Sequence, residues 1–331
     1  MTDRREKGRA APLGRCASLL FPFSGSGDGI LTASGPRKAA DGPVPVQGPV
    51  LRAVAVDGLI LIPFKKNNEL TMMKTCKNLW MAAWACCVLT ACHVSPQWQL
   101  TWEDDFNAGE LDTTVWSKIP RGGSDWDRHM ADYPDLYRMT DSTLVLYARA
   151  NRSHPADSAP YLTGGVWSRY KKEFKFGRVE VRARFSSAQG FWPAIWMCPD
   201  PIPYPYGGEI DIMEHLNYDA FVYQTSHSHY TVNLKRNTPP KYTTAPVRQD
   251  EFNTYAVEMY PDSLVYYTNG KRTICYPKVN GGRDGQFPFA YDPFHLRMDC
   301  QLGGSWVGKV AADQLPAWME IDWVRYYERK K

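Results

Sequence analysis

Polar and apolar residues alternate strictly over residues 178–185, which is the period of a β-strand with one buried face. Residues 254–260 and 318–327 also have the composition of strands, and Asn269-Gly270 lies between two β-rich segments, which predicts a tight hairpin. Gly- and Pro-rich turns recur along the chain, whereas we find no convincing amphipathic helix and no internal repeat. The pattern predicts a single all-β domain, a sandwich or jelly roll.

The composition supports a globular protein. The chain has 331 residues, of which 44% are hydrophobic and 22% charged, and this excludes wholesale disorder. No apolar run reaches the roughly 18 residues of a membrane-spanning helix. The formal net charge of +4 arises in the first 91 residues, whereas the remainder is mildly acidic. We therefore expect no nucleic-acid partner for the main domain.

The N-terminal part is expected to differ from the rest. Residues 1–72 are rich in Gly, Pro, Ala and Arg without periodicity, so they are either disordered or a mis-assigned upstream extension, and we favour the second. Met73 begins a new basic segment, which a short apolar stretch and Leu89-Thr90-Ala91-Cys92 follow. Residues 73–91 resemble a bacterial lipoprotein signal peptide. The alternative is an ordinary secretory signal with incidental cysteines.

This resemblance implies that Cys92 is lipidated and anchors the protein in the bacterial cell envelope, at the outer membrane, on a face that the sequence leaves open. The exported domain would be residues 92–331. Its remaining cysteines, Cys198, Cys275 and Cys300, permit at most one disulfide and lack zinc-site spacing, so we expect small buried hydrophobic residues.

Three carboxylates lie within the six residues Glu209-Ile210-Asp211-Ile212-Met213-Glu214. Strand alternation places Glu209 and Asp211 on one face and the two isoleucines in the core. Glu214 would face the core unless one extra residue near Met213 forms a β-bulge, which would return it to the carboxylate face.

Crowded carboxylates raise at least one pKa, which a retaining glycosidase requires. In such an enzyme one ionised carboxylate attacks the anomeric carbon, and a protonated one about 5–5.5 Å away protonates the leaving oxygen. A calcium cluster and a solvated acidic strand remain alternatives for these residues taken alone.

The segment resembles the catalytic signature of glycoside hydrolase family 16, in the bulged form typical of laminarinases, agarases and endo-galactosidases. Residues 102–106, 174–183, 190–197 and 319–327 are similar to the family's other segments, in its order. The resemblance implies a β jelly roll of two curved antiparallel sheets with a substrate cleft on the concave face. It assigns Glu209 as nucleophile, Asp211 as assisting acid and Glu214 as acid/base.

The resemblance also implies residues that contact the sugar chain, although core packing is the alternative for at least one of the tryptophans. Residues 225–230 are expected to form the strand beside the catalytic one. A tyrosine stands where many laminarinases have a tryptophan, which puts a pure β-1,3-glucan specificity in doubt. The implied substrate-binding residues are Trp192, Trp196, Tyr206, His227, Gln301 and Trp306.

Some family members hold a structural calcium, and Asp105 and Asp322 match that pattern loosely; two ordinary surface acids are the alternative. No catalytic metal or cofactor is implied, and we expect a monomer. The implied function is an endo-acting, retaining hydrolase of internal β-1,3 or β-1,4 bonds in a β-glucan or a galactose-containing glycan. A non-catalytic glycan-binding lipoprotein and a transglycosylase are the alternatives.

The lipid anchor gives the first testable prediction. When the protein is expressed from Met73 in a Gram-negative host with radioactive palmitate, Cys92→Ala should lose the label and leave the membrane fraction, because the thiol that carries the lipid is gone. Continued labelling of this variant would rule out the anchor.

Overall fold

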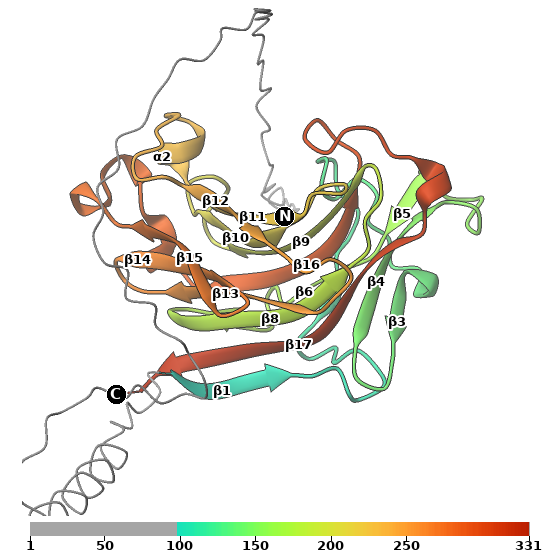
Figure 1. Ribbon diagram of the computed structural model, residues 1–331, viewed down its shortest axis with the longest axis horizontal. Coiled ribbons are helices and arrows are strands. Elements are labelled where there is room, and N and C mark those ends of the chain that lie inside the picture. Colours follow the sequence, from blue (N-terminus) through green and yellow to red (C-terminus); the bar gives the residue numbers. More distant parts are fainter. Residues whose placement is uncertain (1–97, 331) are drawn as a thin grey trace, which may run out of the picture. The chain divides into compact units, whose positions relative to one another are not determined.

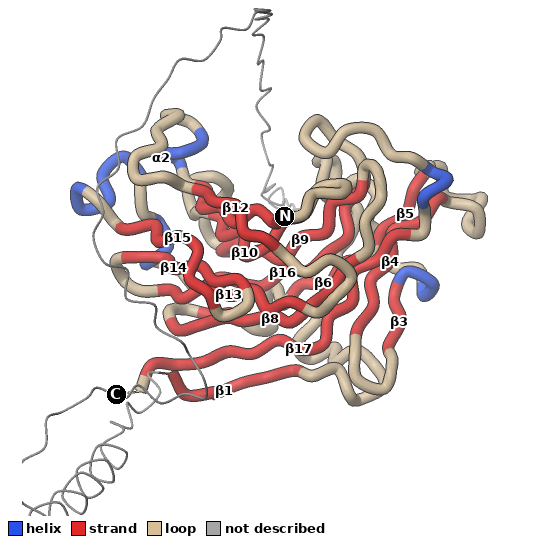
Figure 2. Tube along the Cα trace, viewed as in Figure 1, coloured by secondary structure: helices blue, strands red, loops and turns tan. Residues whose placement is uncertain are grey.

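The computed structural model describes residues 98–330. The segments 1–72 and 73–91 and the predicted lipid site at Cys92 lie outside the described residues. The described part consists of two stacked antiparallel β-sheets (Figure 1), and strands and loops dominate it (Figure 2). Within it, no helix has the length and apolar character to cross a membrane. The predicted all-β fold is confirmed.

One sheet contains nine strands. They are β1 (Trp98–Asp104), β3 (Tyr137–Met139), β4 (Leu144–Ala150), β5 (Tyr161–Thr163), β8 (Gly177–Phe185), β13 (Asn253–Met259), β14 (Ser263–Thr268), β15 (Lys271–Pro277) and β17 (Ala317–Arg329). Their order is β15-β14-β13-β8-β17-β4-β3, with β1 paired to β17 and β5 paired to β4.

The second sheet contains eight strands and is curved, with its concave face turned away from the first sheet (Figure 1). They are β2 (Ser117–Lys118), β6 (Gly165–Trp167), β7 (Glu173–Phe174), β9 (Phe191–Pro199), β10 (Glu209–Glu214), β11 (Phe221–His227), β12 (Tyr242–Pro246) and β16 (Phe294–Leu302). Their order is β12-β11-β10-β9-β16-β6-β2, with β7 paired to β16.

Short helical turns connect the strands. They are α2 (His229–Val232) and the 3-10 turns η1 (Pro134–Leu136), η2 (Asn280–Gly285), η3 (Pro288–Ala290) and η4 (Ala312–Gln314).

Most predicted strands are confirmed. Buried and half-buried residues alternate along all of β8, and Asn269-Gly270 connects the paired strands β14 and β15. One prediction needs correction, because the strand expected over residues 225–230 ends at His227 and α2 begins at His229. The Ser228 N–H donates to the Thr231 hydroxyl (2.9 Å), which stabilises the start of this helical turn instead of a longer strand.

The main core lies between the two sheets. Val179 and Val181 of β8 and Ile210 and Ile212 of β10 are fully buried there. The three described cysteines form no disulfide within the described residues: Cys198 and Cys300 are buried as expected, whereas Cys275 is only half-buried.

The two aspartates suggested for a calcium site make other contacts in the described part of the chain. Asp322 forms an ion pair with Arg182, and the exposed Asp105 accepts a hydrogen bond from Asn107 (2.9 Å). Among the described residues, neither aspartate belongs to a group of candidate metal ligands. The Arg182 guanidinium balances the charge of Asp322, and the suggested calcium site stays a prediction.

Core packing generates a stability prediction. Ile212→Ala should lower the free energy of unfolding by about 2–5 kcal/mol, because it leaves a cavity at a fully buried position. Leu100→Ala is the control, since Leu100 is 42% exposed and should change stability by no more than about 0.5 kcal/mol. Urea unfolding checks both, and equal effects would contradict the assigned core.

Candidate active site

A β-bulge in β10 brings the three carboxylates to one face. Asp211 is opposite Trp196 of β9 and Glu214 is opposite Ala194, so three steps along β10 match two steps along β9. The register against β11 shifts at the same place. The extra residue near Met213 is therefore confirmed, and it turns Glu214 to the same side as Glu209 and Asp211.

Each carboxylate has a specific neighbour. The Cys198 thiol donates to Glu209 Oε2 (3.6 Å), and the Trp192 indole Nε1 donates to Glu214 Oε1 (3.1 Å). The Asp211 carboxylate lies 3.2 Å from His227 Nε2. These contacts orient the acids before any substrate binds.

Burial and mutual repulsion favour protonated carboxyl groups. Burial first, and then the charges of Asp211 and Glu209, raise the pKa of Glu214 well above its usual range. Burial likewise raises the pKa of Asp211 to about 8, although the Lys241 ammonium opposes this shift. Burial lowers the pKa of His227 to about 4, so this imidazole is neutral at pH 7. The site can therefore hold a carboxylic acid that is protonated at neutral pH.

Glu209, Asp211 and His227 are also the described residues whose ligand atoms could meet at a metal ion, since these atoms lie within 4.8 Å of one another. Acid/base chemistry by the two glutamates does not need such an ion.

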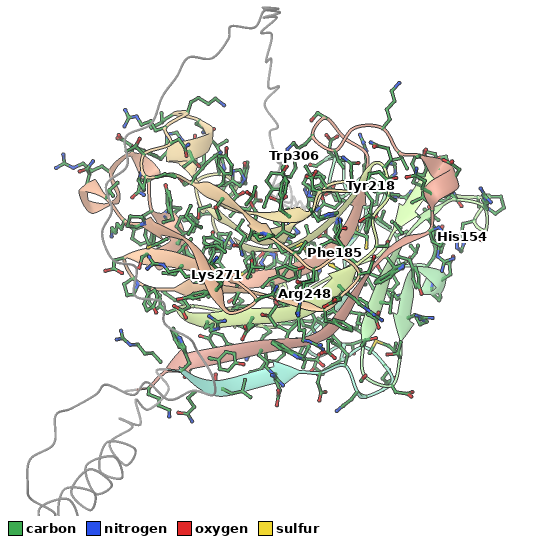
Figure 3. The ribbon with its side chains drawn as sticks, viewed as in Figure 1. His154, Phe185, Tyr218, Arg248, Lys271 and Trp306 are labelled. Carbon is green, nitrogen blue, oxygen red and sulfur yellow. The ribbon has the colours of Figure 1, made fainter. Side chains whose placement is uncertain are left out.

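The two tryptophans of β9 lie on the carboxylate face, and both are almost fully buried. Trp192 packs edge-to-face against Trp306 (5.2 Å between ring centroids), and Trp306 lies over the concave sheet (Figure 3). Trp196 packs edge-to-face against Trp126 (4.9 Å) and under the guanidinium of Arg297 (4.3 Å). Trp192 thus contacts a carboxylate of the cluster directly, whereas Trp196 belongs to a packed cluster beside it.

Of a row of four polar side chains on β16, the sequence predicted Gln301 and missed the other three. His295, Arg297, Asp299 and Gln301 alternate along this strand and are almost fully buried, and Gln301 is opposite Trp192 of β9. Gln301 Nε2 and Trp196 Nε1 donate to the two oxygens of Asp299 (2.7 and 2.8 Å). Burial raises the pKa of Asp299 to about 7. The sequence signal that could have revealed this row is the alternation His-x-Arg-x-Asp-x-Gln over residues 295–301.

Two loops meet above this row. The Asp125 carboxylate accepts hydrogen bonds from the Ser305 backbone N–H (3.0 Å) and from Arg128 (3.0 Å). This contact links the loop that carries Trp126 to the loop that carries Trp306. Trp126 of the first loop lies against Arg297 of β16, whereas Trp306 of the second loop packs on Trp192 of β9 and Tyr223 of β11.

Tyr206 and His227 lie on the opposite side of the carboxylates, away from β16. Tyr206 is 54% exposed and stacks on His229 (4.8 Å between ring centroids). Of the six predicted substrate-binding residues, Trp192, Gln301 and Trp306 lie together, and Trp306 also packs on Tyr223 of β11 (5.1 Å between ring centroids). Tyr206 and His227 lie near Glu209 instead. Trp196 is enclosed by Trp126 and Arg297.

Comparison with known proteins identifies relatives of this chain. The model of glycosyl hydrolases family 16 matches residues 127–325. A keratan-sulfate endo-1,4-β-galactosidase of Sphingobacterium multivorum is 35% identical over 236 residues, which are 70% of this chain and 55% of that protein. The chain thus spans about half the length of this relative. A β-glucanase of Rhodothermus marinus is 30% identical over 283 residues, which are 77% of this chain and 97% of that protein.

Solved structures agree with these relatives. The non-specific endo-β-1,3(4)-glucanase SCLam superposes with a TM-score of 0.64 at 26% identity and covers 71% of this chain and 92% of that chain. A structure from work on endo-acting O-glycanases of the human gut microbiota has a TM-score of 0.62 at 28% identity, and covers 70% of this chain and all of that chain.

The folds, the shared segments and the carboxylate strand lead to one conclusion. The chain belongs to glycosyl hydrolases family 16.

Proposed function

We propose that the protein is an endo-acting, retaining β-glycosidase that cleaves internal bonds of a galactose-containing glycan, such as a poly-N-acetyllactosamine chain. The observation that carries this proposal is the bulge in β10, because it places Glu214 beside Glu209 and Asp211. A glycan-binding protein has no need for three buried carboxylates on one strand, one of them held protonated.

The proposed reaction is a double displacement. Glu209 attacks the anomeric carbon as the glycosidic C–O bond breaks, and Glu214 gives its proton to the leaving oxygen. Glu214 then takes a proton from water, which attacks the same carbon and releases Glu209. Two inversions retain the anomeric configuration. Asp211 and its partner His227 orient the nucleophile, and the Trp192 N–H orients Glu214.

The polar row of β16 supports a galactose-containing substrate. Galactose carries an axial hydroxyl that needs an additional polar partner, and Asp299 and Gln301 supply buried hydrogen-bonding groups next to Trp192. We place the glycone, the sugars that stay with Glu209, on this side. The 35% identity to a keratan-sulfate endo-1,4-β-galactosidase supports the same choice.

A β-glucan is the second candidate substrate. It is favoured by the Rhodothermus marinus β-glucanase, which this chain matches over 97% of its length. A polysaccharide screen with product sizing separates the two, using poly-N-acetyllactosamine, keratan and mucin glycans against laminarin and mixed-linkage glucan. Adding a competing sugar acceptor tests transglycosylation in the same assay.

We also retain the proposal that a lipid at Cys92 anchors the protein in the bacterial envelope. It rests on the segment 73–92, which lies outside the described residues. An envelope location suits an enzyme whose polymeric substrate is outside the cell.

The mechanism predicts different behaviour of the two glutamate variants. Glu209→Gln should abolish turnover and still bind the glycan, because it removes the nucleophile at nearly constant volume. Glu214→Gln should cripple cleavage of natural glycans but spare aryl glycosides, whose leaving groups depart without protonation. Added azide should then yield a β-glycosyl azide. Proton NMR of the first product checks the outcome, and an α-anomer would overturn both assigned roles.

The electrostatics predict a shift in pH dependence. Negative charge on Asp211 raises the pKa of Glu214, so Asp211→Asn should let Glu214 lose its proton at lower pH. The basic limb of the kcat/KM profile should therefore move to lower pH, together with a lower maximum. Asp262→Asn, at an exposed turn of the other sheet, is the control and should leave the profile in place. An unmoved or upward-shifted basic limb in Asp211→Asn contradicts the coupling.

A further inference from the structure

Two aromatic rings form an exposed flat surface beside the carboxylates. The Tyr206 ring stacks on the His229 imidazole with 4.8 Å between centroids and 16° between planes. The Asn233 side-chain amide donates to His229 Nδ1 (2.9 Å) and fixes the imidazole from behind. Tyr206 remains 54% exposed, so one face of a pre-oriented ring is open to a ligand.

The backbone ties this surface to the catalytic strand pair. Glu209 of β10 is opposite His227 of β11. Tyr206 precedes Glu209 by three positions and His229 follows His227 by two, so the stacked pair continues the same two strands. Three residues of extended chain span at most about 11 Å, which keeps Tyr206 near the carboxylates.

The connection between Tyr206 and Glu209 is rigid. A Cβ atom on Gly207 would lie 2.5 Å from the Ile202 carbonyl oxygen. Gly208 has a φ of +88°, and a Cβ atom there would lie 2.8 Å from the Phe289 ring. Glycine is therefore the only residue that fits at either position. The tight packing around Gly207 and Gly208 holds Tyr206 at a fixed place relative to Glu209.

The order of strands assigns a side to this surface. β11 and β16 lie on opposite sides of the β9–β10 pair. If β16 holds the glycone, as proposed above, the sugar on the leaving-group side must lie toward β11 and α2. A tyrosine ring can stack on the apolar face of a pyranose. Because the Tyr206 ring is exposed, a sugar that binds there does not have to displace water from a buried site.

We propose that Tyr206 and His229 form the subsite for the leaving-group sugar, with a pyranose ring stacked on Tyr206 and His229 acting as a positioning residue. This inference rests on the proposed glycosidase function and on the placement of the glycone at β16. It deepens that function by assigning a subsite to Tyr206, which the sequence already predicted to bind substrate, and by adding His229, which no sequence motif singled out.

Substrates with and without a leaving-group sugar test the proposal. For an oligosaccharide that the wild-type protein cleaves, Tyr206→Ala should raise KM about tenfold, the scale expected for one lost stacking contact. For the β-glycosyl fluoride of the same glycone, KM should change far less, because fluoride has no ring to stack. Tyr206→Phe should restore most of the affinity for the oligosaccharide.

The role of His229 has its own readout. His229→Ala should raise KM for the oligosaccharide less than Tyr206→Ala does, and His229→Phe should rescue it by keeping a flat partner. The double variant Tyr206→Ala/His229→Ala should be no worse than Tyr206→Ala alone, since His229 acts through the tyrosine. Additive effects would show that His229 acts independently and would overturn the positioning role.

Tyr170→Ala is the matched control. Tyr170 is 71% exposed and follows β6, which lies beyond β16 near the opposite edge of the same sheet from β11. Its loss should therefore leave KM for both substrates unchanged. If Tyr206→Ala leaves the oligosaccharide KM unchanged, or impairs both substrates equally, the subsite is overturned while the glycosidase function stands. If the wild-type protein cleaves neither class of substrate, the proposed function itself fails.

Discussion

The extra residue in β10 is the constraint on which the site depends. In a regular strand, Glu209 and Asp211 would face the concave side and Glu214 would point into the core between the sheets. The bulge reverses the side-chain direction after Asp211 without interrupting the pairing of β10 with β9 and β11. Ile210 and Ile212 therefore stay fully buried while the third carboxylate joins the other two. One strand anchors the core and presents the three carboxylates.

Burial of three carboxylates is costly, and the surrounding donors show how the fold offsets it. Glu209 accepts a hydrogen bond from a thiol, Asp211 faces an imidazole, and Glu214 accepts a hydrogen bond from an indole N–H. Such partners hold geometry without adding a full positive charge, so they leave the pKa of Glu214 high. A nearby arginine would stabilise the cluster better and would ionise the acid that must donate a proton.

The two sides of the concave face have different chemistry. On the β16 side, polar groups are buried beside Trp126, whose loop is joined to the loop of Trp306 by the contact of Asp125 with Ser305. On the β11 side, Tyr206 is exposed and rests on His229. This asymmetry suits a polar glycan whose one part is gripped by hydrogen bonds and whose other part is released after cleavage.

The bulge near Met213 was implied by the family resemblance and is established by the pairing of β10 with β9. The sequence alone determined the all-β class, most strands and the hairpin at Asn269-Gly270. Each follows from the period-two alternation of side chains or from local turn chemistry, which short segments encode by themselves. The N-terminal segment also carries a local signal, the cysteine-ended stretch before residue 93, which stays a prediction.

Tertiary structure decided which side chains meet across strands. Packing of the Trp126 loop encloses Trp196, and Arg182 forms an ion pair with Asp322. Pairing of β16 with β9 brings the polar row of β16 beside Trp192. The contact of Tyr206 with His229 joins residues 23 positions apart through a short helix that the sequence pattern did not predict. Alternation reveals the face on which a residue lies, but its neighbours depend on strand order and loop packing, and these are set by contacts between distant segments.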